Sequence, residues 1–206
     1  EAPVVAATPA DGSGEAARLA GACADLEALR AAVESFDGCA LKRGARTTVF
    51  ADGNPAARVM VIGEAPGREE DREGRPFIGA SGQLLDKMLA AIGLSRMAED
   101  REQAVYITNV LPWRPPQNRD PLPEETAMMK PFLMRHIELV KPDFLMLVGN
   151  PSNQLLLETD KSVTKLRGQW HEVAGIPAVS IFHPAYLMRA PAQKRLAWAD
   201  LLMLKA

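Results

Sequence analysis

The chain has 206 residues, of which 47% are hydrophobic, and its formal net charge is −2. A chain of this length can bury one good core as a single domain, and its charge excludes the overall basic character of many nucleic-acid-binding proteins. With 2 cysteines it can form neither a disulfide framework nor an all-cysteine metal site. We therefore expect free thiols in a cytoplasmic protein, and the lack of a long apolar run predicts no membrane association.

The N-terminal part of the chain changes character at residue 15. Residues 1–14 are rich in Ala, Pro, Gly and Thr, which predicts a flexible lead-in, and residues 15–206 are expected to form the one domain. Over residues 15–36 apolar side chains recur at helical spacing, so we predict a single amphipathic helix. Residues 37–57 are expected to be irregular and to contain an Asp-Gly-Asn-Pro turn.

From residue 59 onward, short aliphatic segments alternate with helical patterns. We predict strands at residues 59–62, 104–110, 144–148 and 179–182. We predict helices at residues 82–92, 124–140, 151–157 and 192–204. Strands that alternate with helices are typical of a parallel sheet covered on both faces. The expected fold is α/β: a single-domain, three-layer α/β/α sandwich around a four-stranded parallel sheet.

The loop after the first predicted strand, residues 63–67, reads Gly-Glu-Ala-Pro-Gly. Open α/β sheets bind their ligands at the carboxyl ends of strands, and glycines let a ligand approach the backbone closely. An ordinary strand-to-helix turn would also explain the glycines. An acid at a strand end, Glu64, is harder to explain in that way and favours a site.

Three further residues mark the same predicted edge of the sheet. Phe77 lies between glycines, Asn109 ends the second strand, and His183 follows the fourth. A core phenylalanine, a loop-capping asparagine and a structural histidine are the alternatives. Because the strand ends meet at one edge, we instead expect an aromatic face for a flat ligand, an amide that reads its edge, and a polar ring beside it.

Residues 186–189 and several basic residues complete the candidate surface. Tyr-Leu-Met-Arg after His183-Pro-Ala forms either a helix start that packs on the core or a wedge between stacked bases. Basic residues near the strand ends would form a local phosphate-binding rim, although scattered surface charge is the usual explanation. The residues of this predicted DNA-contacting surface are Arg46, Arg114, Lys165, Arg167, Tyr186, Leu187, Met188 and Arg189.

Four motifs occur in order: GEAPGREEDREGRPFIGASGQLLDKML, VYITNVLPWRPPQNRDPLPEE, VTKLRGQW and FHPAYLMR. On these motifs the chain resembles family 4 of the uracil-DNA glycosylase superfamily, from roughly residue 39 to residue 200. The resemblance implies a monofunctional enzyme whose partner is DNA containing uracil, and nothing in the sequence asks for more than a monomer. It would hydrolyse the N-glycosidic bond of deoxyuridine and leave an abasic site, the first step of base excision repair.

The same resemblance implies roles for individual residues. His183, facing uracil O2, and Glu64, in a supporting role beside the water, would be catalytic. Phe77 would stack on the flipped base, and Asn109 would hydrogen-bond its edge. Residues 185–189 would enter the duplex from the minor-groove side. The full set implied to bind the substrate is Gly63, Ala65, Gly67, Glu70, Phe77 and Asn109.

The chain departs from this family at one place. Family 4 members usually hold a four-iron, four-sulfur cluster on four cysteines, and the corresponding positions here are Phe36, Cys39, Trp113 and Met129. One thiolate cannot hold such a cluster, so we predict no cluster and no other metal or cofactor. Two alternatives stay open: a catalytically silent nucleic-acid-binding homologue, or a glycosylase for another deaminated base such as hypoxanthine or xanthine.

Overall fold

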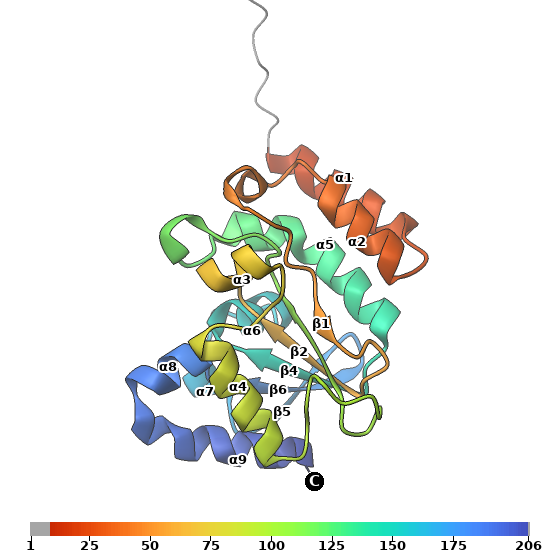
Figure 1. The fold of residues 1–206 in the computed structure, drawn as a ribbon. Helices are drawn as coiled ribbons and strands as arrows, with labels where there is room; N and C mark the ends of the chain where they lie inside the picture. Colours follow the sequence, from red (N-terminus) through yellow and green to blue (C-terminus); the bar gives the residue numbers. More distant parts are fainter. Residues whose placement is uncertain (1–8, 206) are drawn as a thin grey trace, which may run out of the picture.

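The computed structural model describes residues 9–205, which form helices on both sides of one mixed sheet (Figure 1). The sheet has six strands in the order β1-β3-β2-β4-β6-β5. Their bounds are β1 (Asp52–Gly53), β2 (Val59–Gly63), β3 (Val105–Asn109), β4 (Phe144–Val148), β5 (Trp170–Val173) and β6 (Ile176–Ile181). Neighbours among β2, β3, β4 and β6 pair in parallel, whereas β1 and β5 are antiparallel edge strands.

The α/β class is therefore confirmed, but the prediction of a four-stranded parallel sheet is wrong. Its four central strands are the predicted ones, and two antiparallel edge strands were missed. β1 is only two residues long, too short to show any alternation. β5 exposes Trp170 and Glu172, so it lacks the continuous apolar run of a strand buried on both faces.

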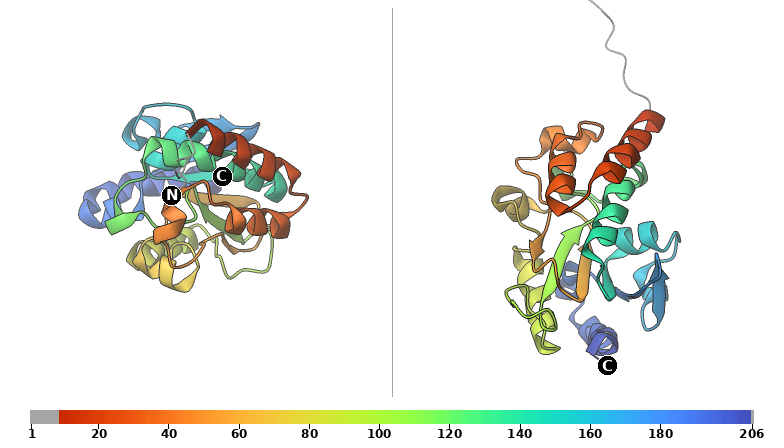
Figure 2. Two further views of the ribbon diagram at one scale, coloured as in Figure 1. Left: turned by 90° about the horizontal axis from the view of Figure 1, so that it is seen from above. Right: turned by 90° about the vertical axis from the view of Figure 1, so that its right-hand side faces the viewer.

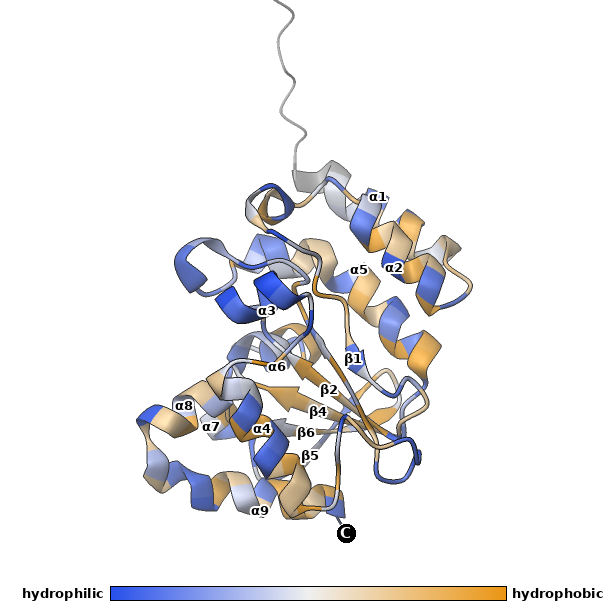
Figure 3. Cartoon of the chain, viewed as in Figure 1, coloured by the Kyte–Doolittle hydropathy of each residue, from blue (hydrophilic) through white to orange (hydrophobic). Residues whose placement is uncertain are grey.

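The central strands are apolar because helices cover both of their faces (Figures 1 and 2). Every residue of β2 and β3 is buried, and β2 and β4 are drawn mostly orange in Figure 3. On one face lies α5 (Pro123–Val140), which is covered in turn by α1 (Pro9–Ala22) and α2 (Leu26–Ser35). On the other face lie α4 (Ala80–Ala91), α8 (Pro184–Arg189) and α9 (Lys194–Lys205).

Shorter helices connect these layers near the ends of the strands. They are α3 (Arg68–Glu73), α6 (Asn150–Leu156) and α7 (Val163–Leu166), together with the 3-10 turns η1 (Ala40–Gly44), η2 (Pro116–Asn118) and η3 (Pro191–Gln193). The hydrophilic α3 follows β2 directly (Figure 3). Within residues 9–205, no helix combines the length and the apolar character needed to cross a bilayer.

The N-terminal region differs from the prediction in two ways. The first eight residues of the predicted lead-in lie outside the described part of the chain, and residues 9–14 already belong to α1. The predicted helix over residues 15–36 is two helices, because α1 ends at Ala22 and α2 begins after Asp25. The Asp25 side chain accepts the N–H of Ala28 and so caps the second helix, a strong start signal.

Candidate active site

Three strands end at one edge of the sheet and bring the predicted site residues together. Gly63, the last residue of β2, lies opposite Asn109, the last residue of β3. His183 follows β6 by two residues and begins α8. Side chains alternate along strands, and the buried residues two positions earlier in each strand share the face covered by α4 and α9. The predicted convergence at this edge is confirmed.

Gly63 lies at the centre of this group. An added Cβ atom at Gly63 would lie 2.3 Å from Cε2 of Phe77 and 2.5 Å from Oδ1 of Asn109. The Phe77 ring also stacks on the His183 ring, with 5.7 Å between centroids and 30° between planes. Gly63, Phe77, Asn109 and His183 therefore form one cluster, which we call the strand-end cluster.

The side-chain oxygen of Asn109 is unusual. Asn109 is only 7% exposed, and within residues 9–205 its Oδ1 is the one buried side-chain polar atom without a hydrogen-bond partner. About nine-tenths of buried polar groups in proteins are bonded, and an unbonded acceptor carries a desolvation cost of roughly 1–3 kcal/mol. Such an atom, held beside an aromatic ring, is suited to accept a hydrogen bond from a ligand.

The His183 ring is held in one protonation state by its surroundings. Its Nδ1 accepts the N–H of Ala185 at 3.1 Å, so the proton of the neutral ring is on Nε2. Burial, with a smaller contribution from the Arg189 charge, lowers the pKa of His183 to about 4, against the opposing charge of Glu70. At neutral pH the ring therefore donates without carrying a positive charge.

Glu64 directly follows Gly63, the last residue of β2. Burial, and secondarily the negative charge of Asp120, raises the pKa of the Glu64 carboxyl to about 7. Its main-chain carbonyl accepts the N–H of Leu111, which fixes the backbone there. No side-chain hydrogen bond joins Glu64 to another described residue, so its carboxyl group is free to act on a ligand and titrates near neutral pH.

Glu70, which the resemblance places among the substrate-binding residues, bonds backbone groups of the protein. Its carboxylate accepts the N–H groups of Gly67, Ile78 and Gly79 at 3.1, 2.9 and 2.9 Å. It thus joins the loop after β2 to the loop that carries Phe77. Of the other two predicted binding residues in this loop, Ala65 packs on the core and Gly67 precedes α3. Glu70 shapes the site, because backbone groups already occupy its carboxylate.

Two of the predicted DNA-contacting residues make contacts within the fold. Leu187 is 1% exposed and packs with Phe182, so it is a core residue of α8. Arg167 donates to both carboxylate oxygens of the buried Asp200 and lies 5.9 Å from the centroid of the Phe182 ring. A guanidinium engaged in this way holds α9 against the loop before β5.

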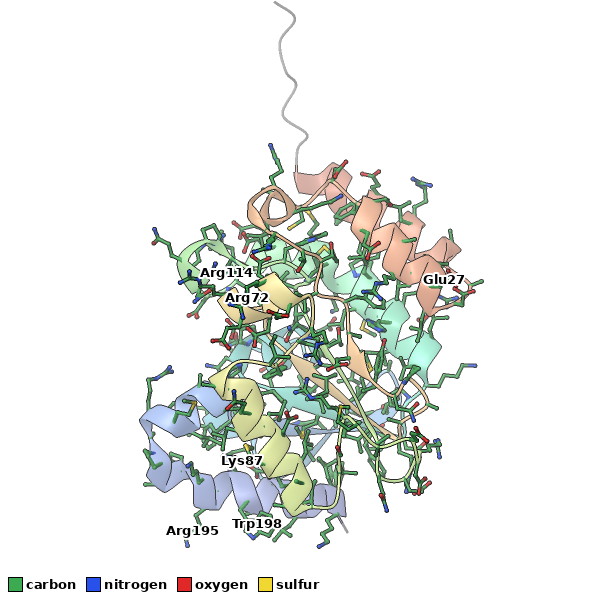
Figure 4. The ribbon with its side chains drawn as sticks, in the orientation of Figure 1. Glu27, Arg72, Lys87, Arg114, Arg195 and Trp198 are labelled. Atoms are coloured by element: carbon green, nitrogen blue, oxygen red, sulfur yellow. The ribbon has the colours of Figure 1, made fainter. Side chains whose placement is uncertain are left out.

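The other six predicted DNA contacts remain at the surface. Met188 is 48% exposed and Arg189 is exposed beside it, while Tyr186 is half-buried against Phe182. Arg46 and Lys165 are exposed, and Arg114 is partly exposed. Arg114 lies on the side of α3, whereas Arg195 projects from α9 (Figure 4). These positions are compatible with a surface around the strand-end cluster.

The four positions at which the family carries its iron–sulfur cysteines are buried in the apolar core that includes α5. Phe36, Cys39, Trp113 and Met129 are each at most 2% exposed and belong to one apolar cluster. The Phe36 ring meets the Phe132 ring edge-on, with centroids 5.2 Å apart. The indole N–H of Trp113 donates to the Thr48 hydroxyl at 3.0 Å. Close-packed side chains fill this region.

The sequence did not predict a role for Arg96, a buried arginine near the strand-end cluster. Arg96 lies in the loop after α4 and donates to the carbonyl oxygens of Pro76 and Phe77. No local pattern marks it, because its two carbonyl partners lie about twenty residues earlier in the chain. An arginine inside a stretch of surface charges looks like any other surface arginine until the fold is known.

The fold and the strand-end cluster define a class: an α/β protein that holds an aromatic ring, a buried amide and an imidazole together at one edge of its sheet. The chain belongs to the uracil DNA glycosylase superfamily, whose family model matches residues 50–202. It is 37% identical to the type-4 uracil-DNA glycosylase of Thermotoga maritima over 168 residues, 80% of this chain and 83% of the relative. It is also 37% identical to that of Archaeoglobus fulgidus over 161 residues, 74% and 78% of the two chains.

Proposed function

We propose that the chain excises uracil from DNA by hydrolysing its N-glycosidic bond. The observation that carries this proposal is the unpaired Asn109 Oδ1 beside the Phe77 ring and the neutral His183 donor. In the reaction the C1′–N1 bond breaks and its electrons leave with uracil. The oxygen of a water molecule bonds to C1′, and a proton from that water balances the charge of the departing base. The products are uracil and an abasic site.

The target nucleotide must leave the stack before this chemistry, which costs a few kcal/mol. Stacking on Phe77 would return about 1–3 kcal/mol of that cost. The exposed Met188 and Arg189 on α8 are the side chains placed to contact the opened duplex. Arg46, Arg114, Lys165 and Tyr186 extend that contact in our proposal, through phosphate and base contacts that carry little sequence information.

Asn109 would select uracil over cytosine. Its Oδ1 accepts the N3–H of uracil, and its Nδ2 donates to O4. Cytosine presents a bare N3 and an amino group at these positions, so acceptor would face acceptor and donor would face donor. A site built to bond a substrate N–H rejects an analogue that lacks it, because its own buried polar group is then unpaired.

His183 and Glu64 would act on the two charges of the transition state. The Nε2–H of His183 would donate to uracil O2, where negative charge develops, and a donor of this kind contributes about 10²–10³-fold to rate. The ionised Glu64 carboxylate would orient the water or favour the cationic sugar. We assign Glu64 this supporting role, since no described contact joins it to the strand-end cluster.

We also propose that the protein works without an iron–sulfur cluster. The residues at the family's ligand positions do not fit one: an aryl ring, a thiol, an indole and a thioether offer one thiolate among them. The packing of Phe36 on Phe132 and the hydrogen bond of Trp113 to Thr48 support the proposal that side-chain packing stabilises this region in place of a cluster. We expect the purified protein to be colourless; an iron assay tests this, and stoichiometric iron would refute it.

The deciding experiment for the activity uses oligonucleotides that carry uracil, hypoxanthine or thymine, followed by alkali to reveal abasic sites. We expect strand breaks at uracil and none at thymine, and a rate about 10²–10³-fold lower for His183→Ala. Breaks at hypoxanthine alone would reassign the substrate, and no breaks on any of the three would leave a silent binding homologue. If the protein is monofunctional, as we propose, the product strand should stay intact until alkali is added. Gel filtration tests the proposed monomer.

A further inference from the structure

We infer that Arg96 is a positioning residue for Phe77, an inference that rests on the proposed base-binding role of Phe77. The Phe77 backbone has a φ of 52°, in the left-handed region that costs a residue with a side chain about 1–2 kcal/mol. A conformation of this kind persists only where the surroundings over-determine it. The contacts on the two sides of Phe77 do so.

On the carbonyl side, the Arg96 guanidinium bridges two successive peptide groups. Its Nη1 lies 2.8 Å from the oxygen of Pro76, and its Nη2 lies 2.7 Å from the oxygen of Phe77. The Arg96 side chain is only 7% exposed, so these bonds are shielded from water. Two parallel donors on one rigid plane fix the direction of both carbonyl groups.

The charge of Arg96 is balanced from two other elements. Its Nε donates to Asp86 on α4 at 2.9 Å, and its Nη1 lies 3.1 Å from Asp52 on β1. A buried guanidinium without partners would be strongly unfavourable. With them, Arg96 ties the Phe77 loop both to the edge of the sheet and to the helix that follows the loop.

On the amide side, Glu70 accepts the N–H groups of Ile78 and Gly79. Arg96 thus holds the peptide groups on both sides of Phe77, and Glu70 holds the two N–H groups that follow it. With its backbone fixed, the ring lies against Gly63 and His183 before any base arrives. Such pre-organisation removes an ordering cost from binding and from the chemical step.

The test substitutes Arg96→Lys, which keeps the charge but cannot present the two-pronged donor. Arg135→Lys is the matched control, because Arg135 also donates twice to a carbonyl, that of Cys23, and pairs with Glu138, far from the site. We expect kcat/KM on a uracil oligonucleotide to fall on the order of tenfold to a hundredfold for Arg96→Lys and to stay within about twofold for Arg135→Lys.

A double-mutant cycle with Phe77→Ala separates positioning from general stability. If Arg96 acts through Phe77, Arg96→Lys should change kcat/KM by less than about twofold in the Phe77→Ala background. An equal loss in both backgrounds, or no loss in a folded Arg96→Lys protein, would overturn the inference. Should Arg96→Lys not fold, Asp86→Ala removes one partner of Arg96 at a half-exposed carboxylate, and the same cycle applies with a smaller loss.

Amide hydrogen exchange of the peptide spanning residues 75–80 provides a readout that needs no catalysis. Arg96→Lys should speed exchange there and leave the rest of the sheet protected, whereas Arg135→Lys should not affect residues 75–80. Unchanged exchange would contradict the inference even if the wild type proved inactive on uracil. Faster exchange with an inactive wild type would refute the proposed function and leave the bridge between Arg96 and the Phe77 loop established.

Discussion

At the scale of single residues, Asn109 and Asn153 form an informative pair. Both are buried near strand ends, but Asn153 is fully engaged: its Nδ2 donates to the carbonyls of Leu147 and Gly149, and its Oδ1 accepts from Ser180. The Oδ1 of Asn109 has no partner among the described residues. The fold therefore uses every hydrogen-bonding group of the Asn153 amide, whereas the Asn109 acceptor is left for the ligand that we propose.

We predict opposite consequences for the two alanine substitutions. Asn109→Ala removes an unbonded acceptor, so the free energy of unfolding should change by less than about 1 kcal/mol, while kcat/KM on uracil should fall about 10–100-fold. Asn153→Ala breaks three hydrogen bonds and should destabilise by about 1–3 kcal/mol. Urea denaturation with steady-state kinetics checks both, and a strongly destabilised Asn109→Ala protein would show that this amide is structural.

Glu64 makes both stability and activity depend on pH. Its pKa is raised from 4.5 to about 7 in the folded chain, so folding favours the protonated form. The stabilisation from this group is present below pH 4.5, the unfolded value, and is lost as the pH rises through about 7. Glu64→Gln stays neutral, so its melting temperature should exceed that of the wild type at about pH 8 and match it near pH 4.

The same titration predicts the pH–rate profile. Since the ionised Glu64 is the active form in our proposal, kcat should rise with pH through about 7. His183, with a pKa of about 4, stays neutral across this range and adds no second limb. Glu64→Gln should flatten the profile at a lower rate, and an unchanged profile in that variant would assign the ionisation to another group.

At the scale of helices and strands, the sequence predicted what depends on local pattern. The four buried parallel strands and α5 follow continuous apolar runs and helical spacing, and β4 has the predicted bounds. The edge strands β1 and β5 were not predictable in this way, because their pairing with β3 and β6 is set by the fold and their exposure is mixed. The break between α1 and α2 was missed although Asp25 is a good capping residue.

The candidate site divides along the same line. Asn109 and His183 could be predicted because a polar residue just beyond an apolar strand is a local signal. Arg96 could not, since its role depends on carbonyl groups brought to it by tertiary structure. Leu187 and Arg167 were placed on the surface because the sequence does not reveal which side of α8 packs inward or that Asp200 is buried.

The start of α4 gives a prediction at this scale. An added Cβ atom at Gly82 would lie 1.8 Å from the carbonyl oxygen of Phe77, so the helix can pack on the Phe77 loop only with glycine there. Gly82→Ala should push the loop away, lowering both stability and kcat/KM. Gly21→Ala, with open space around the added atom, should be neutral or stabilise α1 by up to about 1 kcal/mol. Thermal unfolding and kinetics on uracil compare the two.

At the scale of the whole molecule, the apolar core around Trp113 joins segments that are distant in the chain. Trp113 is 1% exposed and bonds Thr48, within the same cluster as Phe36 and Met129. Removing a buried tryptophan side chain typically destabilises a protein by about 3–5 kcal/mol. We expect Trp113→Ala to fall in that range, because both the packing and the hydrogen bond are lost.

Trp198 supplies the control for this prediction. It is 41% exposed and projects from α9 (Figure 4), so Trp198→Ala should change the free energy of unfolding by no more than about 0.5 kcal/mol. Denaturant melts of the two variants make the comparison. Similar small effects in both would mean that the Trp113 region does not brace the fold.

The burial of Cys23 and Cys39 lowers the reactivity of this protein toward oxidants and alkylating agents. Those reagents attack thiolates, and burial raises the pKa of both thiols above the usual value. With 2 cysteines in the whole chain, both shielded, the native protein presents almost no reactive sulfur of this kind. We therefore expect alkylating agents and mild oxidants to modify the native protein at its cysteines far more slowly than the unfolded chain.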